Sequence, residues 1–227
     1  MSKLILIRHG QASFNRSDYD QLSPLGVQQA KWLGAYFAEA NINPTRIITG
    51  DLKRHLQTTE GIIQGLASAN EKIAELEQHT GWNEFDFHMI GQAYLKSHPE
   101  HAPDQANPRS FFSLLRKALR AWSEDQLEGA LPETWICFQS RVLEALNFAR
   151  KNTDNETVLV ISSGGAISMA LQHIMGFDNA TLINLNLQTR NTGFSEIYFN
   201  GLNSYLASFN AVSHLETAKR RNLITYA

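Results

Sequence analysis

The stretch that decides the fold lies at the N-terminus and reads Leu4-Ile5-Leu6-Ile7, followed directly by Arg8-His9-Gly10-Gln11. An unbroken apolar run of this length predicts a strand that is buried on both faces of a sheet. Polar residues that follow such a strand lie beyond its carboxyl end, where open α/β sheets bind their ligands. The sequence therefore predicts a central strand with a candidate site at its end.

Helices and strands alternate around this first strand. Ser23-Pro24 is typical of a helix start, because serine caps the first turn and proline fits its first position. Residues 46–49 predict a second strand, and apolar residues at helical spacing over 52–66 predict a second helix. The same unit returns later as a helix over 138–149, a buried strand over 158–161 and an apolar helix from Gly164-Gly165 to Met175. This alternation predicts a three-layer α/β/α sandwich with a mostly parallel central sheet.

Two segments depart from the alternation. Residues 77–132 combine polar loops with an amphipathic piece that carries Phe111 and Trp122, which indicates an inserted helical lid. Residues 181–210 alternate short β-rich runs with Asn/Gly turns, which predicts antiparallel hairpin strands at a sheet edge. We expect residues 1–227 to form one domain with this lid inserted. Exposed edge strands near the C-terminus would also allow a homodimer.

Composition narrows the range of partners and locations. The 227 residues carry 20 Lys and Arg against 22 Asp and Glu, so there is no basic field to attract nucleic acid. An anion site must therefore be local and made of a few arginines. The single cysteine, Cys137, has no partner for an internal disulfide, which favours a cytoplasmic location. The N-terminal apolar run is too short for an export signal or a membrane anchor.

Several motifs together resemble the histidine phosphatase superfamily, which has the phosphoglycerate mutase-like fold. The first is Arg8-His9-Gly10-Gln11 with Ser13 and Asn15 behind the first strand. The second is the stretch from Gly50 to Thr58, which is similar to the family's Ser-x-Leu-x-Arg-Ala-x-x-Thr pattern and places Arg54 at its arginine. Gly50 and His55 depart from the usual Ser and Ala of that pattern. Asn83-Glu84-Phe85-Asp86 looks like the family's acid element, and Ser208-Phe209-Asn210 to His214-Leu215 is similar to the family's ending.

The resemblance implies a role for each matching residue. His9 is the expected nucleophile and Glu84 the expected proton donor, with Arg8 and Arg54 as further catalytic residues. The expected phosphate-binding residues are Arg8, Asn15, Arg54, Ser163 and Gly164. Planar arginine forks match the oxygens of a phosphoryl group, and imidazole is a competent nucleophile near neutral pH. The expected partner is a small phosphorylated substrate, and the chemistry requires neither a metal ion nor another cofactor.

One departure bears directly on activity. The family's second catalytic histidine stands before two glycines, whereas this chain reads Ser162-Ser163-Gly164-Gly165. A serine can donate one hydrogen bond to a phosphoryl oxygen or cap the following helix, but it carries no positive charge. By analogy with removing one oxyanion donor, the substitution would lower the rate about 10²- to 10³-fold. His55, His88 and Arg190 are candidates to replace the missing cation, with Arg190 slightly preferred because it precedes a turn at a sheet end, but we favour the interpretation of each as ordinary surface.

Three functions follow from these residues. The first is a phosphomonoester hydrolase that works through a phosphohistidine at His9. The second is a catalytically impaired relative that binds a phosphorylated ligand, for which Ser163 is the reason. A phosphoglycerate mutase-type phosphotransferase comes third, because residues 77–132 show no basic cluster for a bisphosphate intermediate. His98-Pro99-Glu100-His101 invites comparison with a metal site, but histidines in a polar loop are more often solvated, and we assign no metal there.

Overall fold

The computed structural model describes residues 1–13, 20–67, 75–104, 107–151, 153, 155–200 and 203–226. Within this part of the chain, six strands form one sheet in the order β3-β2-β4-β1-β5-β6. Their bounds are β1 Ser2–Arg8, β2 Arg46–Thr49, β3 Glu75–Gln78, β4 Thr157–Ser162, β5 Phe194–Asn200 and β6 Asn203–Ala211. The pairs β1–β4, β2–β4 and β2–β3 are parallel, whereas β5 is antiparallel to both β1 and β6. The predicted mostly parallel sheet with antiparallel strands at one edge is confirmed.

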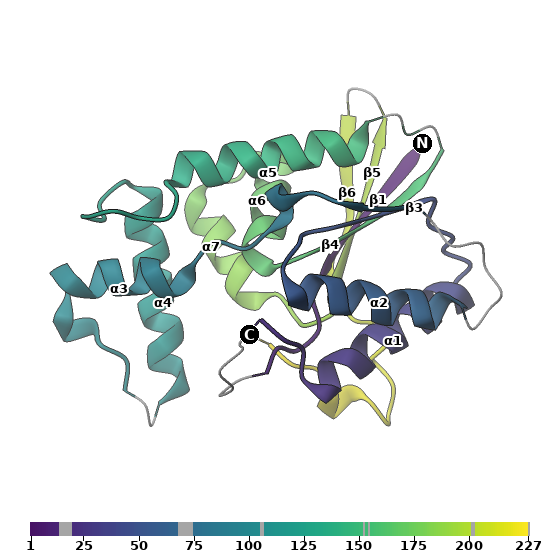
Figure 1. Cartoon of the computed structure of the whole chain (residues 1–227), viewed down its shortest axis with the longest axis horizontal. Coiled ribbons are helices and arrows are strands. Elements are labelled where there is room, and N and C mark those ends of the chain that lie inside the picture. Colours follow the sequence, from purple (N-terminus) through teal and green to yellow (C-terminus); the bar gives the residue numbers. More distant parts are fainter. Residues whose placement is uncertain are drawn as a thin grey trace.

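Helices cover both faces of the sheet (Figure 1). Those of the described residues are α1 Pro24–Glu39, α2 Lys53–Ala67, α3 Phe87–Ser97, α4 Pro108–Ser123, α5 Trp135–Arg150, α6 Gly164–Met175 and α7 Asn179–Gln188, with short 3₁₀ turns η1 Thr80–Trp82, η2 Pro99–His101 and η3 Arg221–Leu223. Along β1, Leu4 and Leu6 join a core cluster with α5, α6 and α7. Ile5 and Ile7 point the other way, into a cluster with α1 and α2. The two-residue alternation of a strand thus builds the predicted three layers.

The end of β1 is held close to the start of α1. The predicted cap is present, since the Ser23 hydroxyl oxygen accepts a hydrogen bond from the Gly26 N–H at 3.0 Å. A Cβ on Gly10 would lie 2.4 Å from the Gly26 carbonyl oxygen, and a Cβ on Gly26 would lie 2.2 Å from that of Gln11. Only residues without a side chain allow this approach, which brings the first turn of α1 against the residues that follow β1.

The structure corrects the bounds of two predicted segments. Residues 77 and 78 do not belong to the insert, because they complete strand β3 at the sheet edge. Thr181 to Gln188 is also not β-structure, since it forms most of helix α7. The Asp178 side chain caps this helix by accepting from the Thr181 N–H at 2.8 Å, and Leu182 and Ile183 are buried on it. A side-chain cap and burial of one helix face therefore override the strand-like alternation of apolar and polar residues.

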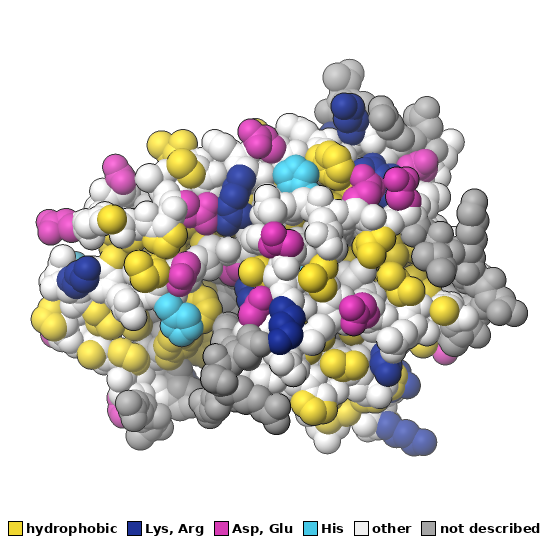
Figure 2. All heavy atoms as spheres, viewed as in Figure 1, with side chains coloured by type: hydrophobic (Ala, Val, Ile, Leu, Met, Phe, Trp, Pro, Cys, Tyr) yellow, Lys and Arg dark blue, Asp and Glu magenta, His cyan; other side chains and the backbone are white. Residues whose placement is uncertain are grey.

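The insert stands beside the sandwich as the helix pair α3 and α4 (Figure 1). Figure 2 shows hydrophobic side chains gathered over this part of the molecule, and Met89 and Phe111 are exposed there. Trp122 at the end of α4 is buried and packs edge-on against Trp135 of α5, with ring centroids 5.0 Å apart. This aromatic contact joins the insert to the body of the protein. Among the described residues, none of the helices is long and apolar enough to cross a bilayer.

A buried histidine fixes the chain beyond β6. His214 is almost fully buried, and its Nε2 lies 2.8 Å from the hydroxyl of Thr192. The Thr192 hydroxyl donates its proton to the Asn191 carbonyl at 2.7 Å, so His214 is the donor in their contact. Burial lowers the pKa of His214 to about 3, and the positive charge of Arg220 contributes. The imidazole is therefore neutral in the folded protein under ordinary conditions.

We predict that His214 makes the fold sensitive to acid. The unfolded chain takes up a proton on this ring below its ordinary pKa of 6.5, whereas the folded chain does not until about pH 3. Its contribution to stability is thus present above pH 6.5 and is lost as the pH falls, by about 2 kcal/mol at pH 5. Denaturant unfolding from pH 7.5 to 5 should show a shallower pH dependence for His214→Gln than for the wild type. Equal slopes would contradict the assignment.

Candidate active site

His9 lies just beyond β1 and is buried. Its backbone N–H donates to the Ser162 carbonyl at 2.9 Å, which ties it to the end of β4. Burial, followed by the charges of Arg54 and Arg8, holds its pKa well below the ordinary value, so the ring is neutral near pH 7. Its Nδ1 lies 2.7 Å from the Gly10 carbonyl oxygen, which can only accept, so the ring proton is on Nδ1. The lone pair of Nε2 is then available as a nucleophile.

Arg8 and Arg54 approach the same ring from different elements. Arg8 is the last residue of β1 and donates to the Thr189 carbonyl oxygen, and Arg54 lies in the first turn of α2. Both are buried, and both act electrostatically on His9 and on Glu84. The two guanidinium groups, the imidazole and the carboxyl group therefore share one environment. Such a pair of buried cations suits an anionic ligand that can accept hydrogen bonds from both.

Arg54 and the end of β1 are linked through Thr58. The Thr58 hydroxyl donates to the Arg54 carbonyl at 2.7 Å and accepts from the Gly10 N–H at 3.0 Å. Sequence reasoning did not identify Asp20, which accepts from Arg54 at 2.7 Å and from the backbone N–H of Lys53 at 2.8 Å. This carboxylate caps the first turn of α2 and holds the arginine in place. A single aspartate in a polar stretch gives no signal of such a role in the sequence.

Glu84 reaches the site from the loop after η1. Its carboxylate accepts from the N–H of Gly165 in the first turn of α6 at 3.0 Å. Burial raises its pKa, even though this hydrogen bond and the charges of Arg54 and Arg8 act in the opposite direction. A Cβ on Gly165 would lie 2.2 Å from the Glu84 carboxylate oxygen, so glycine is required at this position. A carboxyl group with a raised pKa suits proton donation near neutral pH.

Ser163 occupies the position between β4 and α6. It is the N-cap residue of α6 by backbone position, but its hydroxyl makes no capping hydrogen bond. The hydroxyl oxygen instead lies 2.7 Å from Nε2 of His55 and accepts from Arg54 at 3.4 Å. Of the two interpretations of Ser163, side-chain capping is therefore wrong. Gly164 follows as the buried first residue of α6, where a Cβ would crowd the side chains of Asn186 and Thr189 at 2.6 Å.

One of the predicted phosphate ligands, Asn15, lies outside the described residues.

The candidates for a replacement cation fall in different places. His88 is exposed on α3 against the ring of Phe87. The backbone of Arg190 forms the expected turn, with its carbonyl accepting from Gly193 at 2.9 Å. The interpretation of His55 as ordinary surface is wrong, because it is completely buried within the site and its ring centroid lies 5.8 Å from that of His9.

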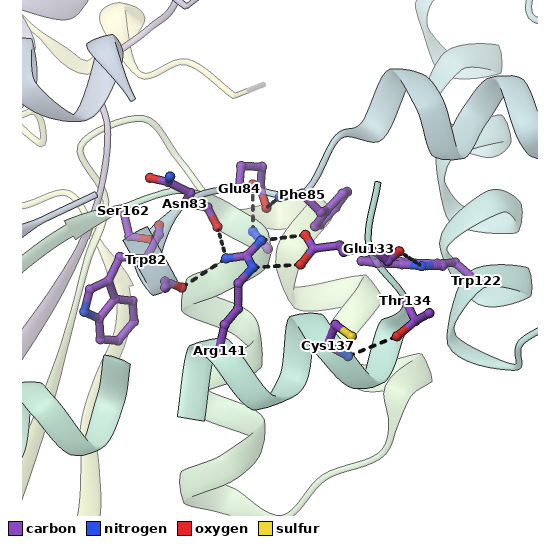
Figure 3. A network of polar contacts seen from close by, with 12 residues as sticks. Trp82, Asn83, Glu84, Phe85, Trp122, Glu133, Thr134, Cys137, Arg141 and Ser162 are labelled. Atoms are coloured by element: carbon purple, nitrogen blue, oxygen red, sulfur yellow. Dashed lines mark hydrogen bonds and ion pairs between the residues drawn. The ribbon is translucent and has the colours of Figure 1, made fainter. Parts of the chain in front are cut away.

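A guanidinium group from α5 holds the loop that carries Glu84 (Figure 3). Arg141 donates to the carbonyl oxygens of Gly81 at 3.1 Å and Asn83 at 2.7 Å. It also forms a bidentate ion pair with Glu133, at 2.8 and 2.6 Å. Ser162 adds a bond from its hydroxyl to the Trp82 carbonyl at 2.6 Å. Arg141 therefore positions the residues directly before Glu84, a function that sequence reasoning missed because its helical spacing gives no distinct signal.

Possible metal ligands lie in the insert. Among the described residues, His98, Glu100 and His101 bring one ligand atom each within 4.8 Å of one another. His98 and Glu100 are exposed, and Nδ1 of His101 lies 2.9 Å from the Tyr94 hydroxyl. This cluster belongs to η2 and the residue before it, and it is not part of the arrangement around His9.

The fold and the site together place two buried guanidinium groups and a raised-pKa carboxyl group around a neutral imidazole. A sequence model of the histidine phosphatase superfamily (branch 1) matches residues 4–212, and the chain belongs to this family. A broad-specificity phosphatase of Saccharomyces cerevisiae is 28% identical over 176 residues, which cover 75% of this chain and 69% of the yeast protein. A 2,3-bisphosphoglycerate-dependent phosphoglycerate mutase of Corynebacterium glutamicum is 26% identical over 223 residues, covering 82% of each chain.

A solved structure supports the same fold. The phosphoserine phosphatase of Entamoeba histolytica, in complex with 3-phosphoglyceric acid, superposes with a TM-score of 0.64. The match covers 95% of this chain and 100% of that chain at 22% identity. The phosphoglycerate mutase-like fold expected from the sequence is therefore confirmed.

We predict that Glu84 lowers stability at neutral pH. Because burial raises its pKa, the folded protein binds this proton more tightly than the unfolded chain does. Its stabilising contribution is complete below the ordinary pKa of about 4.5 and is lost as the pH rises through the raised value. Glu84→Gln should therefore equal or exceed the wild type in free energy of unfolding at pH 8, with the difference shrinking toward pH 4.5. Urea unfolding of both proteins at several pH values measures this difference. A variant that becomes less stable than the wild type as the pH rises would contradict the prediction.

We predict that Arg141 contributes to turnover without contacting substrate. Arg141→Ala frees the Gly81 and Asn83 carbonyls and should lower kcat about 10- to 100-fold by displacing Glu84. Binding of inorganic phosphate, measured by calorimetry, should change much less. Arg120→Ala is a matched control, because Arg120 pairs with Glu124 on the exposed surface of α4 and should leave both quantities unchanged. Equal losses of kcat and phosphate affinity would point to general disruption of the site instead.

Proposed function

We propose that this protein is a phosphomonoester hydrolase that acts through a phosphohistidine on His9. The observation that carries this proposal is the neutral, buried imidazole of His9, whose proton is held on Nδ1 by the Gly10 carbonyl between two buried guanidinium groups. Family membership and the relationship to a yeast phosphatase support it. The proposed reaction can be written with side chains of this chain alone.

The first half of the reaction transfers the phosphoryl group to the protein. Nε2 of His9 attacks phosphorus, and a bond forms between nitrogen and phosphorus as the bond to the leaving oxygen breaks. Glu84, whose pKa is raised by burial, gives its proton to that oxygen. Arg8 and Arg54 stabilise the charge on the non-bridging oxygens, and the N–H groups at the start of α6 and the Ser163 hydroxyl add hydrogen bonds.

The second half returns the protein to its starting state. Glu84 is now ionised and takes a proton from a water molecule, which attacks phosphorus from the side that the leaving group occupied. The nitrogen–phosphorus bond breaks and its electron pair returns to His9, while Glu84 regains its proton. Inorganic phosphate leaves, so one water is consumed for each ester hydrolysed.

The proposed substrate is a small phosphorylated molecule. The related phosphoserine phosphatase has been solved with 3-phosphoglyceric acid, a compound of this size. Cytoplasmic location and a homodimer stay predictions from the single cysteine and the sheet edge. The similarity to phosphoglycerate mutases is the reason to retain a phosphotransferase as a hypothesis, and it is the weakest of the three.

A second function is favoured by one observation. Serine stands at position 163, buried, where the family pattern has a histidine, so the site lacks one cation. A protein that binds a phosphorylated ligand without turnover would follow if the remaining groups do not stabilise the transition state. Phosphate binding by Arg8 and Arg54 is common to both functions, and only turnover separates them.

Single-turnover labelling with a generic phosphomonoester tests the proposal. We expect an acid-labile phosphoenzyme in the wild type and none in His9→Ala, together with release of phosphate over time. Arg54→Ala should lower the labelling rate about 10²- to 10³-fold, as loss of a transition-state donor does. Phosphate binding without any label, at every pH from 5 to 8, would establish the binding function in place of hydrolysis.

A further inference from the structure

His55 occupies an unusual place for a helical residue. It lies in the first turn of α2, is completely buried and has its Nε2 2.7 Å from the Ser163 hydroxyl oxygen. Its ring is tilted by 40° to that of His9, with the centroids 5.8 Å apart. The imidazole thus lies within the candidate site, against the residue that follows β4.

The three departures from the family pattern meet at this imidazole. Gly50 replaces the usual Ser, His55 the usual Ala and Ser163 the usual His. A Cβ on Gly50 would lie 2.4 Å from Nδ1 of His55 and 3.0 Å from its Cε1. A side chain at position 50 would therefore exclude this ring from its present place, and the short serine at 163 leaves room on its other side. Relative to the family pattern, the histidine expected at position 163 is absent and one stands beside it at position 55.

Hydrogen-bond directions connect His55 to the phosphoryl site. Burial and the charge of Arg54 hold the pKa of His55 well below its ordinary value, so the ring carries one proton. Nδ1 is buried and has no hydrogen-bond partner among the described residues. If the proton is on Nε2, then Nδ1 is an unpaired acceptor. If the proton is on Nδ1, then Nδ1 is a buried donor without a partner, which is the rarer arrangement. Nε2–H therefore donates to Ser163.

The Ser163 hydroxyl is then left with one direction for its own proton. Its oxygen accepts from His55 at 2.7 Å and from Arg54 at 3.4 Å. A hydroxyl has two acceptor lone pairs and one donor hydrogen, so both lone pairs are in use. The remaining O–H must donate to a group outside this pair, and a phosphoryl oxygen bound by Arg54, as in the proposed function, would be such an acceptor.

We propose that His55 is a positioning residue, which orients the Ser163 hydroxyl toward the phosphoryl group and so supplies, through the serine, the hydrogen bond but not the positive charge of a histidine at position 163. This inference rests on the proposed function for its effect on turnover. The bond from His55 to Ser163 also has an effect that can be measured without turnover, because the oriented hydroxyl contributes to binding of inorganic phosphate.

Three substitutions at position 55 separate positioning from packing. His55→Gln keeps an N–H donor, His55→Phe keeps a ring of similar size without a donor, and His55→Ala removes both. We expect kcat for a generic phosphomonoester to fall about 10- to 100-fold in the Phe and Ala variants, with a smaller change in KM, and to recover partly in the Gln variant. His88→Ala is the control, as an exposed histidine on α3 whose loss should leave kcat unchanged. Equal activity of the Phe variant and the wild type would overturn the proposal.

A double-mutant cycle between positions 55 and 163 is the decisive experiment. Ser163→His alone should lose activity, because an imidazole at 163 would meet the ring of His55, now 2.7 Å from the serine oxygen. Combining it with His55→Ala makes room for the new ring, so the double variant should exceed both single variants in kcat. Additive losses would overturn the proposal. An acid-stable label on Ser163 would also overturn it, since the serine would then be a nucleophile.

Measuring phosphate binding by calorimetry across the same cycle keeps the two proposals apart. If the wild type hydrolyses nothing, the proposed function fails, while coupling between positions 55 and 163 in the dissociation constant of phosphate still supports the role of His55. If the wild type turns over and the cycle is additive in both kcat and phosphate binding, only the role of His55 fails.

Discussion

The parallel pairing of β1 with β4, and of β4 with β2, is the constraint on which the site depends. In this register Arg8 stands opposite Ser162 and Thr49 opposite Ile161, so three strands end at the same level of the sheet. The backbone continues the pairing by one step, since His9 N–H donates to Ser162 and Gly50 N–H to Ile161. The residues that leave these strands must then converge, whatever their separation in the sequence.

Convergence of these residues at the buried carboxyl ends of the strands has an electrostatic consequence. Burial, followed by the charge of Arg54, suppresses the protonated form of both His9 and His55, and the charge of Arg8 adds to this effect at His9. The same burial raises the pKa of Glu84, although the arginines oppose it. The site thus holds a neutral imidazole and a carboxyl group whose pKa is raised, which are the starting states that the proposed phosphoryl transfer requires. Pre-set protonation of this kind is a property of the environment and not of any single side chain.

Much of the fold followed from local patterns, because burial and capping leave clear marks in sequence. The apolar run before Arg8 and the Ser23-Pro24 start of α1 are such marks, and both were predicted correctly. Thr181 to Gln188 was misjudged as β-structure, since its alternating apolar residues are helical once Asp178 caps them and the neighbouring helices cover Leu182 and Ile183. The grouping of His9, Arg8, Arg54 and Glu84 was likewise foreseen through family motifs. The positions of Asp20, Arg141 and His55 were not, because each acts through a contact between distant segments that no local spacing encodes.

Arg141 is bound to the chain at two places, on either side of helices α3 and α4. One guanidinium group binds the loop directly before Glu84, at Gly81 and Asn83, and the segment that precedes α5, at Glu133. Helices α3 and α4 lie between these two attachments, so we expect changes in their length or shape to leave the backbone at Gly81 and Asn83 in place. Substitutions on these helices would then alter the surface of the protein without displacing the residues before Glu84. The exposed aromatic and aliphatic side chains of α3 and α4 would then be the part of this protein most open to evolutionary change.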